Sequence, residues 1–282
     1  MTTRTDQPER EFEYCREDFE AVRKMLYART GISLADSKFQ LVYSRLARRL
    51  RALRLNSIGH YLRYLQAHDE EQEHFVNALT TNLTSFFREP HHFVVLERFL
   101  REKAGQGRRF RLWCAAASTG EEAYSMAMVA LEALGSNPPV SIIATDIDSQ
   151  VLQHAQLGIY TQERCAGLSA ERLKQFCLRG KAGSGQAGMV RMRRELQRLI
   201  EFRTLNLLAS QWSVQAPFDI IFCRNVMIYF DKPTQGKLLE RMIPMLTDDG
   251  LYIAGHSESF TNAGSLVRLV DRTVYAPVGR SR

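Results

Sequence analysis

The sequence predicts an α/β protein in which an all-α N-terminal domain precedes a Rossmann-like sheet that carries a small antiparallel β-subdomain. Three observations predict this fold. Residues 18–82 have helical patterns and no convincing strand, residues 110–130 have the pattern of a strand, a tight turn and a helix, and later segments continue this alternation. Ligands bind at the carboxyl ends of the strands in such sheets, so the polar residues that follow each strand are the candidate site residues.

Composition limits the classes of protein that the chain can represent. Its 282 residues are 45% hydrophobic, which is enough for a large core or two modest ones. The five cysteines are odd in number and contain no Cys-x-x-Cys, so we expect neither a disulfide framework nor a metal site, and a reducing cytoplasm fits. The N-terminus is too polar for a signal peptide, and no apolar run approaches the ~18 residues of a membrane span. The formal charge of +7 admits an acidic partner, which could be nucleic acid, an anionic membrane surface or a protein.

Residues 1–80 are expected to form the helical domain, with breaks at Thr30-Gly31, at 56–59 and at His68-Asp69. The second helix, from about Lys38 to Leu55, has an apolar stripe through Val42, Leu46, Leu50 and Leu53. Three arginines project from its opposite face, at Arg45, Arg48 and Arg51. No acidic residue occurs from position 38 to position 63, which favours a docking surface for acidic groups over an ordinary solvated face.

Residues 81–95 are predicted to be a linker. It carries Asn82, Thr84 and Arg88 among aromatic residues, which is chemically richer than a spacer requires. Helix capping together with a surface arginine is the alternative explanation. The favoured interpretation is that the linker contributes to a binding site.

The stretch from Phe110 to Ala130 predicts a cofactor site. A strand ends at Cys114, the small residues of 115–120 form a turn, and a helix follows. Small residues let the backbone and the amides of a helix N-terminus approach a ligand closely. The acidic pair Glu121-Glu122 would repel a pyrophosphate but suits a cofactor with hydroxyls and positive charge, such as S-adenosylmethionine. An ordinary strand-to-helix turn, with acids favouring the helix start, is the alternative.

The next strand, from Val140, has a buried run that ends at Asp146. An acid at the end of the second strand can accept hydrogen bonds from both ribose hydroxyls of a nucleoside cofactor. The alternative is an N-cap for a helix over Ser149–Gly158, which Asp148 could fill equally well. The two aspartates are therefore expected to divide these roles.

Residues 168–202 interrupt the alternation. A short helix is expected near Ser169–Cys177, followed by a glycine-rich loop, Gly180–Gly188, that lacks the lysine and Ser/Thr ending of a phosphate-binding loop. We interpret this loop as a hairpin connection. The roughly alternating segments Met189–Arg193 and Leu199–Arg203 predict a small antiparallel subdomain, inserted at about 173–203.

The most buried-looking strand is predicted within Phe218–Phe230, and its polar interruption, Arg224 and Asn225, falls where the strand should meet the ligand crevice. A buried arginine and asparagine need partners, which a structural network or a binding site could supply, and the position favours a site. Tyr229 can reach the same opening. Asn206-Leu207 follows the preceding strand end, beside the expected cofactor.

The order of these motifs resembles the chemotaxis receptor methyltransferase (CheR) family. The resemblance rests on the small-residue turn, the strand ending in Asp146, Arg-Asn-Val-Met-Ile-Tyr-Phe at 224–230 and Asp-Gly-Leu-Tyr-Ile-Ala-Gly-His-Ser-Glu at 249–258. It extends over nearly the whole chain, from the basic N-terminal helix through Thr-Asn-Leu-Thr-Ser-Phe-Phe-Arg-Glu at 81–89 to the terminal strands.

The resemblance implies a helical receptor-docking domain at 1–80 and an S-adenosylmethionine methyltransferase domain at 96–282. Such enzymes methylate glutamate side chains on the cytoplasmic helices of chemoreceptors, forming methyl esters that serve sensory adaptation. The family's cofactor contacts fall here on Asn82, Thr84, Arg88, Glu122, Asp146, Asn206, Leu207, Arg224 and Asn225. One departure is the Gly180–Gly188 loop, which is longer than in the enteric members and leaves binding of a receptor's C-terminal peptide tether by the β-subdomain open.

Glutamate methylation fits a site without an obvious His/Asp pair. Glutamate has an ordinary pKa near 4.3, so the nucleophile is already ionised at neutral pH and needs no general base. Alignment and exclusion of water are then the catalytic tasks. We expect Arg88 and Tyr229 to orient the carboxylate or the methionine part of the cofactor, with Glu122 and Asp146 holding the cofactor's ammonium and ribose.

Three other functions are weighed against this one. A nucleic-acid methyltransferase fits the basic charge, but the strand at Arg224-Asn225 lacks the Asn/Asp-Pro-Pro-Tyr/Phe type of motif. A sensor that binds the cofactor and docks on receptors without methylating them is a second possibility. A nicotinamide oxidoreductase is least favoured, because the turn lacks Gly-x-Gly-x-x-Gly.

Overall fold

The structure is a computed structural model that describes residues 10–105, 107–181, 183, 185–260 and 263–279. The chain divides into two compact units, Met1–Thr80 and Thr81–Arg282. Within the described ranges, no helix has both the length and the apolar character needed to cross a membrane.

The first unit is helical, as predicted. Its helices are α1 (Arg16–Thr30), the short 3-10 helix η1 (Asp36–Lys38), α2 (Phe39–Leu53), α3 (Ile58–Ala67) and α4 (Glu70–Leu79). The break after α1 is confirmed, because Gly31 ends the helix with a left-handed φ of 69°. The break before α3 is shorter than expected: Ser57 caps that helix by accepting a hydrogen bond from the His60 amide.

The apolar stripe of α2 packs into the core of this unit. Val42, Leu46 and Leu50 are buried, while Leu53 is half-buried. Beside them lies a buried carboxylate, Glu71, which accepts two hydrogen bonds from Arg49 at 2.8 and 2.5 Å and a third from Tyr61 at 2.8 Å. These donors satisfy a charge that would otherwise be costly to bury.

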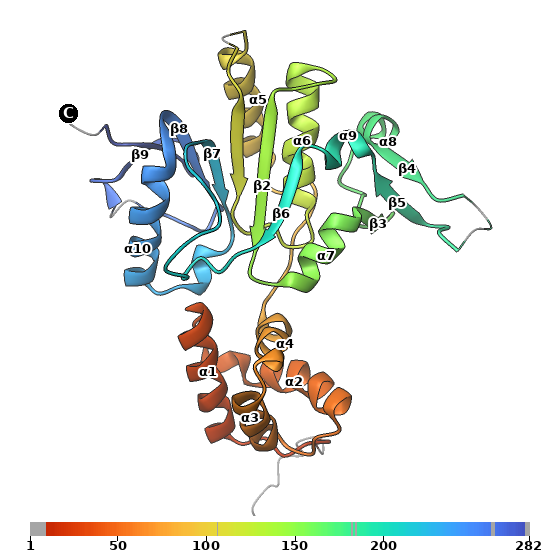
Figure 1. Ribbon diagram of the computed structural model, residues 1–282, viewed down its shortest axis with the longest axis vertical. Helices are drawn as coiled ribbons and strands as arrows, with labels where there is room; N and C mark the ends of the chain where they lie inside the picture. Colours follow the sequence, from red (N-terminus) through yellow and green to blue (C-terminus); the bar gives the residue numbers. More distant parts are fainter. Residues whose placement is uncertain (1–9, 106, 182, 184, 261–262, 280–282) are drawn as a thin grey trace, which may run out of the picture. The chain divides into compact units, whose positions relative to one another are not determined.

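The second unit contains a seven-stranded sheet, shown in Figure 1 with the flanking helices. Its strands are β1 (Phe110–Cys114), β2 (Val140–Asp146), β6 (Ile200–Thr204), β7 (Phe218–Cys223), β8 (Leu246–Ala254), β9 (Val267–Asp271) and β10 (Val274–Pro277). The helices are α5 (His91–Lys103), α6 (Glu121–Leu134), α7 (Ser149–Leu157), α8 (Ala170–Phe176), α9 (Arg194–Gln197) and α10 (Lys232–Met242), with 3-10 turns η2 (Met227–Tyr229) and η3 (Ile243–Met245).

The strand order places the ligand crevice. The order is β6-β2-β1-β7-β8-β10-β9, with the first five strands parallel and the last two antiparallel. From β1 the chain adds β2 and β6 on one side and then returns to add β7 and β8 on the other. In a sheet of this kind the crevice lies at the carboxyl ends of the strands where the order reverses, here β1 and β7. The predicted α/β fold class is confirmed.

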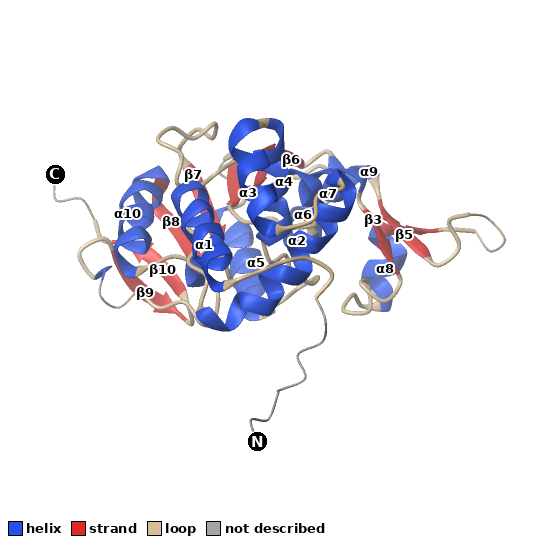
Figure 2. Cartoon of the chain, turned by 90° about the horizontal axis from the view of Figure 1, so that it is seen from below, coloured by secondary structure: helices blue, strands red, loops and turns tan. Residues whose placement is uncertain are grey.

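A second, three-stranded sheet forms the β-subdomain, with antiparallel order β3-β5-β4 over Ile159–Thr161, Met189–Met192 and Cys177–Arg179. Figures 1 and 2 show it beyond the β6 edge of the large sheet. The predicted hairpin across Gly180–Gly188 is confirmed by the pairing of β4 with β5; Ala182 and Ser184 of that loop lie outside the described residues.

The assignment of Leu199–Arg203 to this small sheet was wrong. These residues largely form β6, which pairs in parallel with β2 at the edge of the large sheet, with Ile200 opposite Ile142. An edge strand is half-exposed, so its alternating pattern is the same in either sheet.

Candidate functional site

The turn after β1 lies against the end of β2 and against the linker. Gly120 has a left-handed φ of 97°, and a Cβ there would come within 2.7 Å of the Ala155 Cβ, so the position requires glycine. Ser118 donates its amide to Asp146 at 2.7 Å and its hydroxyl to the Asn82 carbonyl at 3.1 Å. The small-residue turn therefore connects two of the predicted site residues.

The two aspartates at the end of β2 have different partners, and the predicted helix cap is Asp148. Asp148 caps α7 by accepting hydrogen bonds from the amides of Gln150 and Val151, and it accepts another from Asn82 Nδ2 at 2.8 Å. Asp146 lies at the strand end, buried, and accepts from the amides of Ser118 and Asp148. Burial raises the pKa of Asp146 to about 6, against the lowering effect of these amides.

Arg224 is the centre of a buried charge network at the ends of β1 and β7. Its guanidinium is completely buried and lies 2.7 Å from a carboxylate oxygen of Glu122 and 3.3 Å from one of Glu89. It also donates to the Arg88 carbonyl. Glu122 accepts from the thiol of Cys114 at 3.3 Å, and burial raises its pKa while Arg224 opposes the shift. Arg224 thus fixes the positions of the Glu122 side chain and the linker backbone at Arg88.

Glu89 is a member of this network that sequence reasoning did not select. It has a left-handed φ of 58° and accepts hydrogen bonds from the amide and ring of His256, each at 3.1 Å, and from Asn225 Nδ2 at 3.3 Å. Burial alone would raise its pKa, but the charge of Arg224 and these donors outweigh it and hold the pKa at about 2. Its only signal in the sequence was its place in the linker motif after Arg88.

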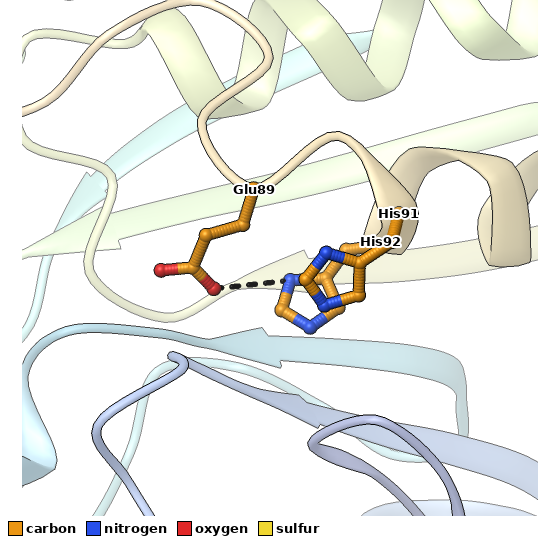
Figure 3. Close-up of side chains that lie close together, drawn as sticks. All are labelled: Glu89, His91 and His92. Atoms are coloured by element: carbon orange, nitrogen blue, oxygen red, sulfur yellow. Dashed lines mark ion pairs between the residues drawn. The ribbon is translucent and has the colours of Figure 1, made fainter.

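Figure 3 shows Glu89 beside two histidines that follow it, His91 and His92. One ligand atom from each of the three lies within 4.8 Å of the others, a spacing compatible with a metal ion. Burial lowers the pKa of His92 to about 3, so its ring is neutral, and its Nε2 lies 2.8 Å from the Thr273 hydroxyl. Because the Glu89 carboxylate is already paired with Arg224, the group is better explained as part of the charge network.

The loop after β7 carries Asn225 and Tyr229. Asn225 has a left-handed φ of 57°, and its amide and that of Met227 donate to the buried carboxylate of Glu258. Tyr229 ends the short helix η2 and is half-buried. From the linker, Arg88 donates to the Leu83 carbonyl at 2.9 Å and is half-buried.

The linker threonine, Thr84, is also half-buried. It lies in the short segment between Asn82, which contacts Asp148, and the Arg88 carbonyl, which contacts Arg224. The structure thus attaches both ends of the predicted linker site to the strand ends of the second unit.

Asn206 and Leu207 follow β6, next to the end of β2. The amide of Leu205 donates to the Asp146 carbonyl at 2.8 Å, and the Asn206 side chain accepts from the Leu208 amide at 2.9 Å. The Leu207 carbonyl accepts from the ring of Trp212 at 3.1 Å and from Arg241 at 3.2 Å.

Arg241 also stacks on Trp212, with its guanidinium carbon 3.9 Å from the ring centroid. Arg241 and Trp212 therefore stabilise the loop that presents Asn206 and Leu207. Neither was selected from the sequence, because each acts through the Leu207 carbonyl, which for Arg241 is distant in the chain.

The three arginines of α2 that were predicted to form a docking face have different surroundings in the structure. Arg45 donates to the carbonyls of Leu79, at 2.9 Å, and Thr80 at the end of α4. Arg51 is exposed and forms an ion pair with exposed Glu11, while Arg48 is exposed. Acids distant in the sequence thus compensate part of this charge, since Glu11 pairs with Arg51 and Glu71 with Arg49, while Arg48 is exposed to solvent.

Two family models match the two units of the chain. Residues 82–276 match the family model described as CheR methyltransferase, SAM binding domain, and residues 17–80 match the model described as CheR methyltransferase, all-alpha domain. The chain belongs to the CheR methyltransferase family. As a member of this family, it is an S-adenosylmethionine-dependent methyltransferase.

Two CheR relatives match over almost their full lengths. Chemotaxis protein methyltransferase 2 of Pseudomonas aeruginosa is 55% identical over 281 residues, covering 98% of this chain and 100% of the relative. The chemotaxis protein methyltransferase of Escherichia coli (strain K12) is 48% identical over 261 residues, covering 92% of this chain and 90% of the relative.

The residues present suit S-adenosylmethionine chemically. Glu122, in the first turn of α6, and Asp146, the last residue of β2, are buried carboxylates that can accept hydrogen bonds from an ammonium and from ribose hydroxyls. Asp146 already accepts two amides and Glu122 is paired with Arg224, so both side chains are fixed in place before a ligand arrives.

Proposed function

We propose that this protein transfers the methyl group of S-adenosylmethionine to glutamate side chains of methyl-accepting chemoreceptors, forming methyl esters in the cytoplasm. The observation that carries the proposal is the agreement of two findings. The relatives named as chemotaxis protein methyltransferases match nearly the whole chain, and the strand ends hold a preformed set of buried carboxylates. Sensory adaptation is the process that such methylation would serve.

The proposed cofactor contacts come from three parts of the second unit. Asn82, Thr84 and Arg88 lie on the linker, while Glu122 lies in the first turn of α6 and Asp146 at the end of β2. The remaining contacts follow β6 and β7, at Asn206, Leu207, Arg224 and Asn225. Because the Arg224 guanidinium is fully buried, its contribution to binding is to hold Glu122 and the Arg88 backbone.

The chemistry requires little from the protein beyond positioning. The cofactor supplies a methyl group on a positively charged sulfur, and its acceptance by a carboxylate oxygen neutralises both charges. A glutamate of ordinary pKa is ionised at neutral pH, so no residue of the chain has to remove a proton. In this proposal Arg88 and Tyr229 orient the reacting carboxylate or the carboxylate of the cofactor, and the surrounding loops exclude water.

The proposed receptor contact is the basic face of α2. Arg48 presents positive charge to solvent, and glutamate-rich helices would complement it. Exposed Arg51 would join this contact by exchanging its partner Glu11 for a receptor glutamate. Arg45 would contribute by fixing the end of α4, since it donates to the carbonyls there.

A receptor's C-terminal peptide tether would engage the β-subdomain. Strand β4 lies at an edge of the small sheet, and an edge strand can accept an added peptide strand. Titration of the protein with the isolated C-terminal peptide of a candidate receptor tests this contact, and absence of binding at millimolar peptide would contradict it.

The proposed reaction is tested by incubating the protein with methyl-labelled S-adenosylmethionine and membranes that contain chemoreceptors. Alkaline treatment then releases methanol from any carboxyl methyl ester. Base-labile label on the receptors supports the proposal, and cofactor binding without transfer contradicts it in favour of a sensor. Filter binding with nucleic acid in parallel separates the nucleic-acid alternative.

A further inference from the structure

Glu258 is a buried carboxylate that the proposed site has not yet used. It lies in the loop after β8, at the end of the Gly-His-Ser-Glu sequence, and only 4% of its surface is exposed. Its carboxylate accepts hydrogen bonds from the backbone amides of Gly255 at 2.6 Å, Met227 at 2.8 Å and Asn225 at 3.1 Å. Burying a carboxylate is costly unless such donors surround it, so this contact set is highly specific.

The three amides belong to two different loops. Gly255 follows β8, whereas Asn225 and Met227 follow β7, the neighbouring strand. The loops also touch directly, because a Cβ at Gly255 would lie 2.5 Å from Asn225 Nδ2 and 2.8 Å from its amide nitrogen. Glu258 therefore joins the two loops at the carboxyl edge of the sheet.

The loop that Glu258 holds includes two proposed site residues. Asn225 needs a left-handed φ of 57°, a conformation that a non-glycine residue keeps only when its surroundings impose it. Glu258 accepts a hydrogen bond from the amide of Asn225 itself and another from the amide of Met227, the first residue of the turn that ends at Tyr229. The Asn225 side chain is thereby directed to Glu89.

We propose that Glu258 is a positioning residue that sets the Asn225–Tyr229 loop for cofactor binding and methyl transfer. It acts through backbone amides and does not itself touch the cofactor. The part of this inference that concerns methyl transfer rests on the proposed function, whereas the part that concerns cofactor binding does not.

The chain offers a matched control at the opposite end of β7. Asp219 is also 4% exposed and also accepts a backbone amide, that of Arg111 at 2.7 Å, together with the side chain of Arg108. It is the second residue of β7, whereas the site lies beyond the last, Cys223. Losing either carboxylate should lower stability, but only Glu258 is connected to the site loop.

The test compares Glu258→Gln with Asp219→Asn. A glutamine places an amide NH₂ where a carboxylate oxygen accepts backbone N–H groups, so at least one bond is lost. For Glu258→Gln we expect the Kd for S-adenosylmethionine, measured by calorimetry without any receptor, to rise about tenfold. For Asp219→Asn we expect a comparable fall in Tm with an unchanged Kd. An unchanged Kd in Glu258→Gln, or an equal rise in both variants, overturns the inference.

Glu258→Asp keeps the test decisive if the glutamine variant does not fold. Its shorter side chain retains the charge but cannot reach all three amides, so an intermediate rise in Kd is expected and an unchanged Kd overturns the inference. A double variant with Tyr229→Phe gives the second readout: kcat effects that combine less than additively indicate action through the same loop, and fully additive effects contradict it. Failure of the unmodified protein to methylate receptors would refute the proposed function and leave the cofactor-binding result intact.

Discussion

The affinity for S-adenosylmethionine should depend on the ionisation of Asp146. Burial raises the pKa of this carboxyl to about 6, from an ordinary value of 3.8. Ribose hydroxyls donate hydrogen bonds to the charged form, so binding favours the ionised carboxylate and weakens as it becomes protonated. The Kd for the cofactor should therefore rise as the pH falls through about 6.

The magnitude follows from the titration. One pH unit below the pKa, about one carboxyl in eleven is ionised. The Kd at about pH 5 should therefore be about tenfold higher than the Kd at about pH 8. The assay is isothermal titration calorimetry of the receptor-free protein across this range, with Asp146→Asn as the variant that removes the titration. A Kd that is flat between these pH values, or an equal slope in Asp146→Asn, would refute this account of Asp146.

The same shift predicts a stability effect. A carboxyl whose pKa is raised in the folded state destabilises the fold once it ionises, so the free energy of unfolding should fall as the pH rises from 3.8 to about 6. The shift corresponds to about 3 kcal/mol at most. Urea unfolding of the unmodified protein and of Asp146→Asn, at each end of this range, measures the difference; equal pH dependence in the two proteins contradicts the assignment.

Four further variants test other parts of the account. Tyr229→Phe should lower kcat with little effect on the Kd for the cofactor, and unchanged turnover in a methylation assay removes the hydroxyl from the mechanism. Glu89→Gln takes a negative charge from buried Arg224 and should reduce the free energy of unfolding by about 3 kcal/mol in urea; a loss within measurement error contradicts the network. Gly255→Ala should raise the Kd for the cofactor, since its methyl group would meet Asn225. Arg48→Glu should raise KM for receptor and flatten its dependence on salt, whereas salt-insensitive KM in the unmodified protein would contradict steering by this face.

The fold was largely predictable because its central strands have strong local signals. Phe110–Cys114 and Val140–Asp146 are both strands as expected, and each is followed by a helix whose start was visible in the sequence. The helix over Phe39–Leu53 was likewise marked by its apolar period. Long, regular segments specify their own structure, so single-sequence reasoning succeeds with them.

The small sheet was harder to predict for a physical reason. Strands β3 and β4 have three residues each, too few to show a period. Leu199–Arg203 shows the alternation of a half-exposed strand, but which sheet it joins depends on its pairing with Val140–Asp146. That pairing joins segments more than fifty residues apart in the sequence.

The position of a candidate residue could be predicted where that residue ends a strand, but not where it contacts distant parts of the chain. Asp146 ends a buried strand and Arg224 directly follows one, so both positions could be predicted. Glu89 contacts residues 136 and 167 positions away, and Glu258 contacts amides about thirty residues back, so neither pattern is visible locally. For Arg45 the basic charge was visible in the sequence, but the carbonyl groups that it contacts at the end of α4 were not.

The central claim is that the methyl group is placed on receptor glutamates, and peptide mapping tests it most directly. A purified chemoreceptor cytoplasmic domain is incubated with the protein and S-adenosylmethionine, digested and analysed by mass spectrometry, alongside a receptor in which each modified glutamate is replaced by glutamine. The account predicts methyl esters on defined glutamates and loss of modification in the substituted receptor. Methylation of another residue type, or of nucleic acid added to the same mixture in place of the receptor, would contradict it.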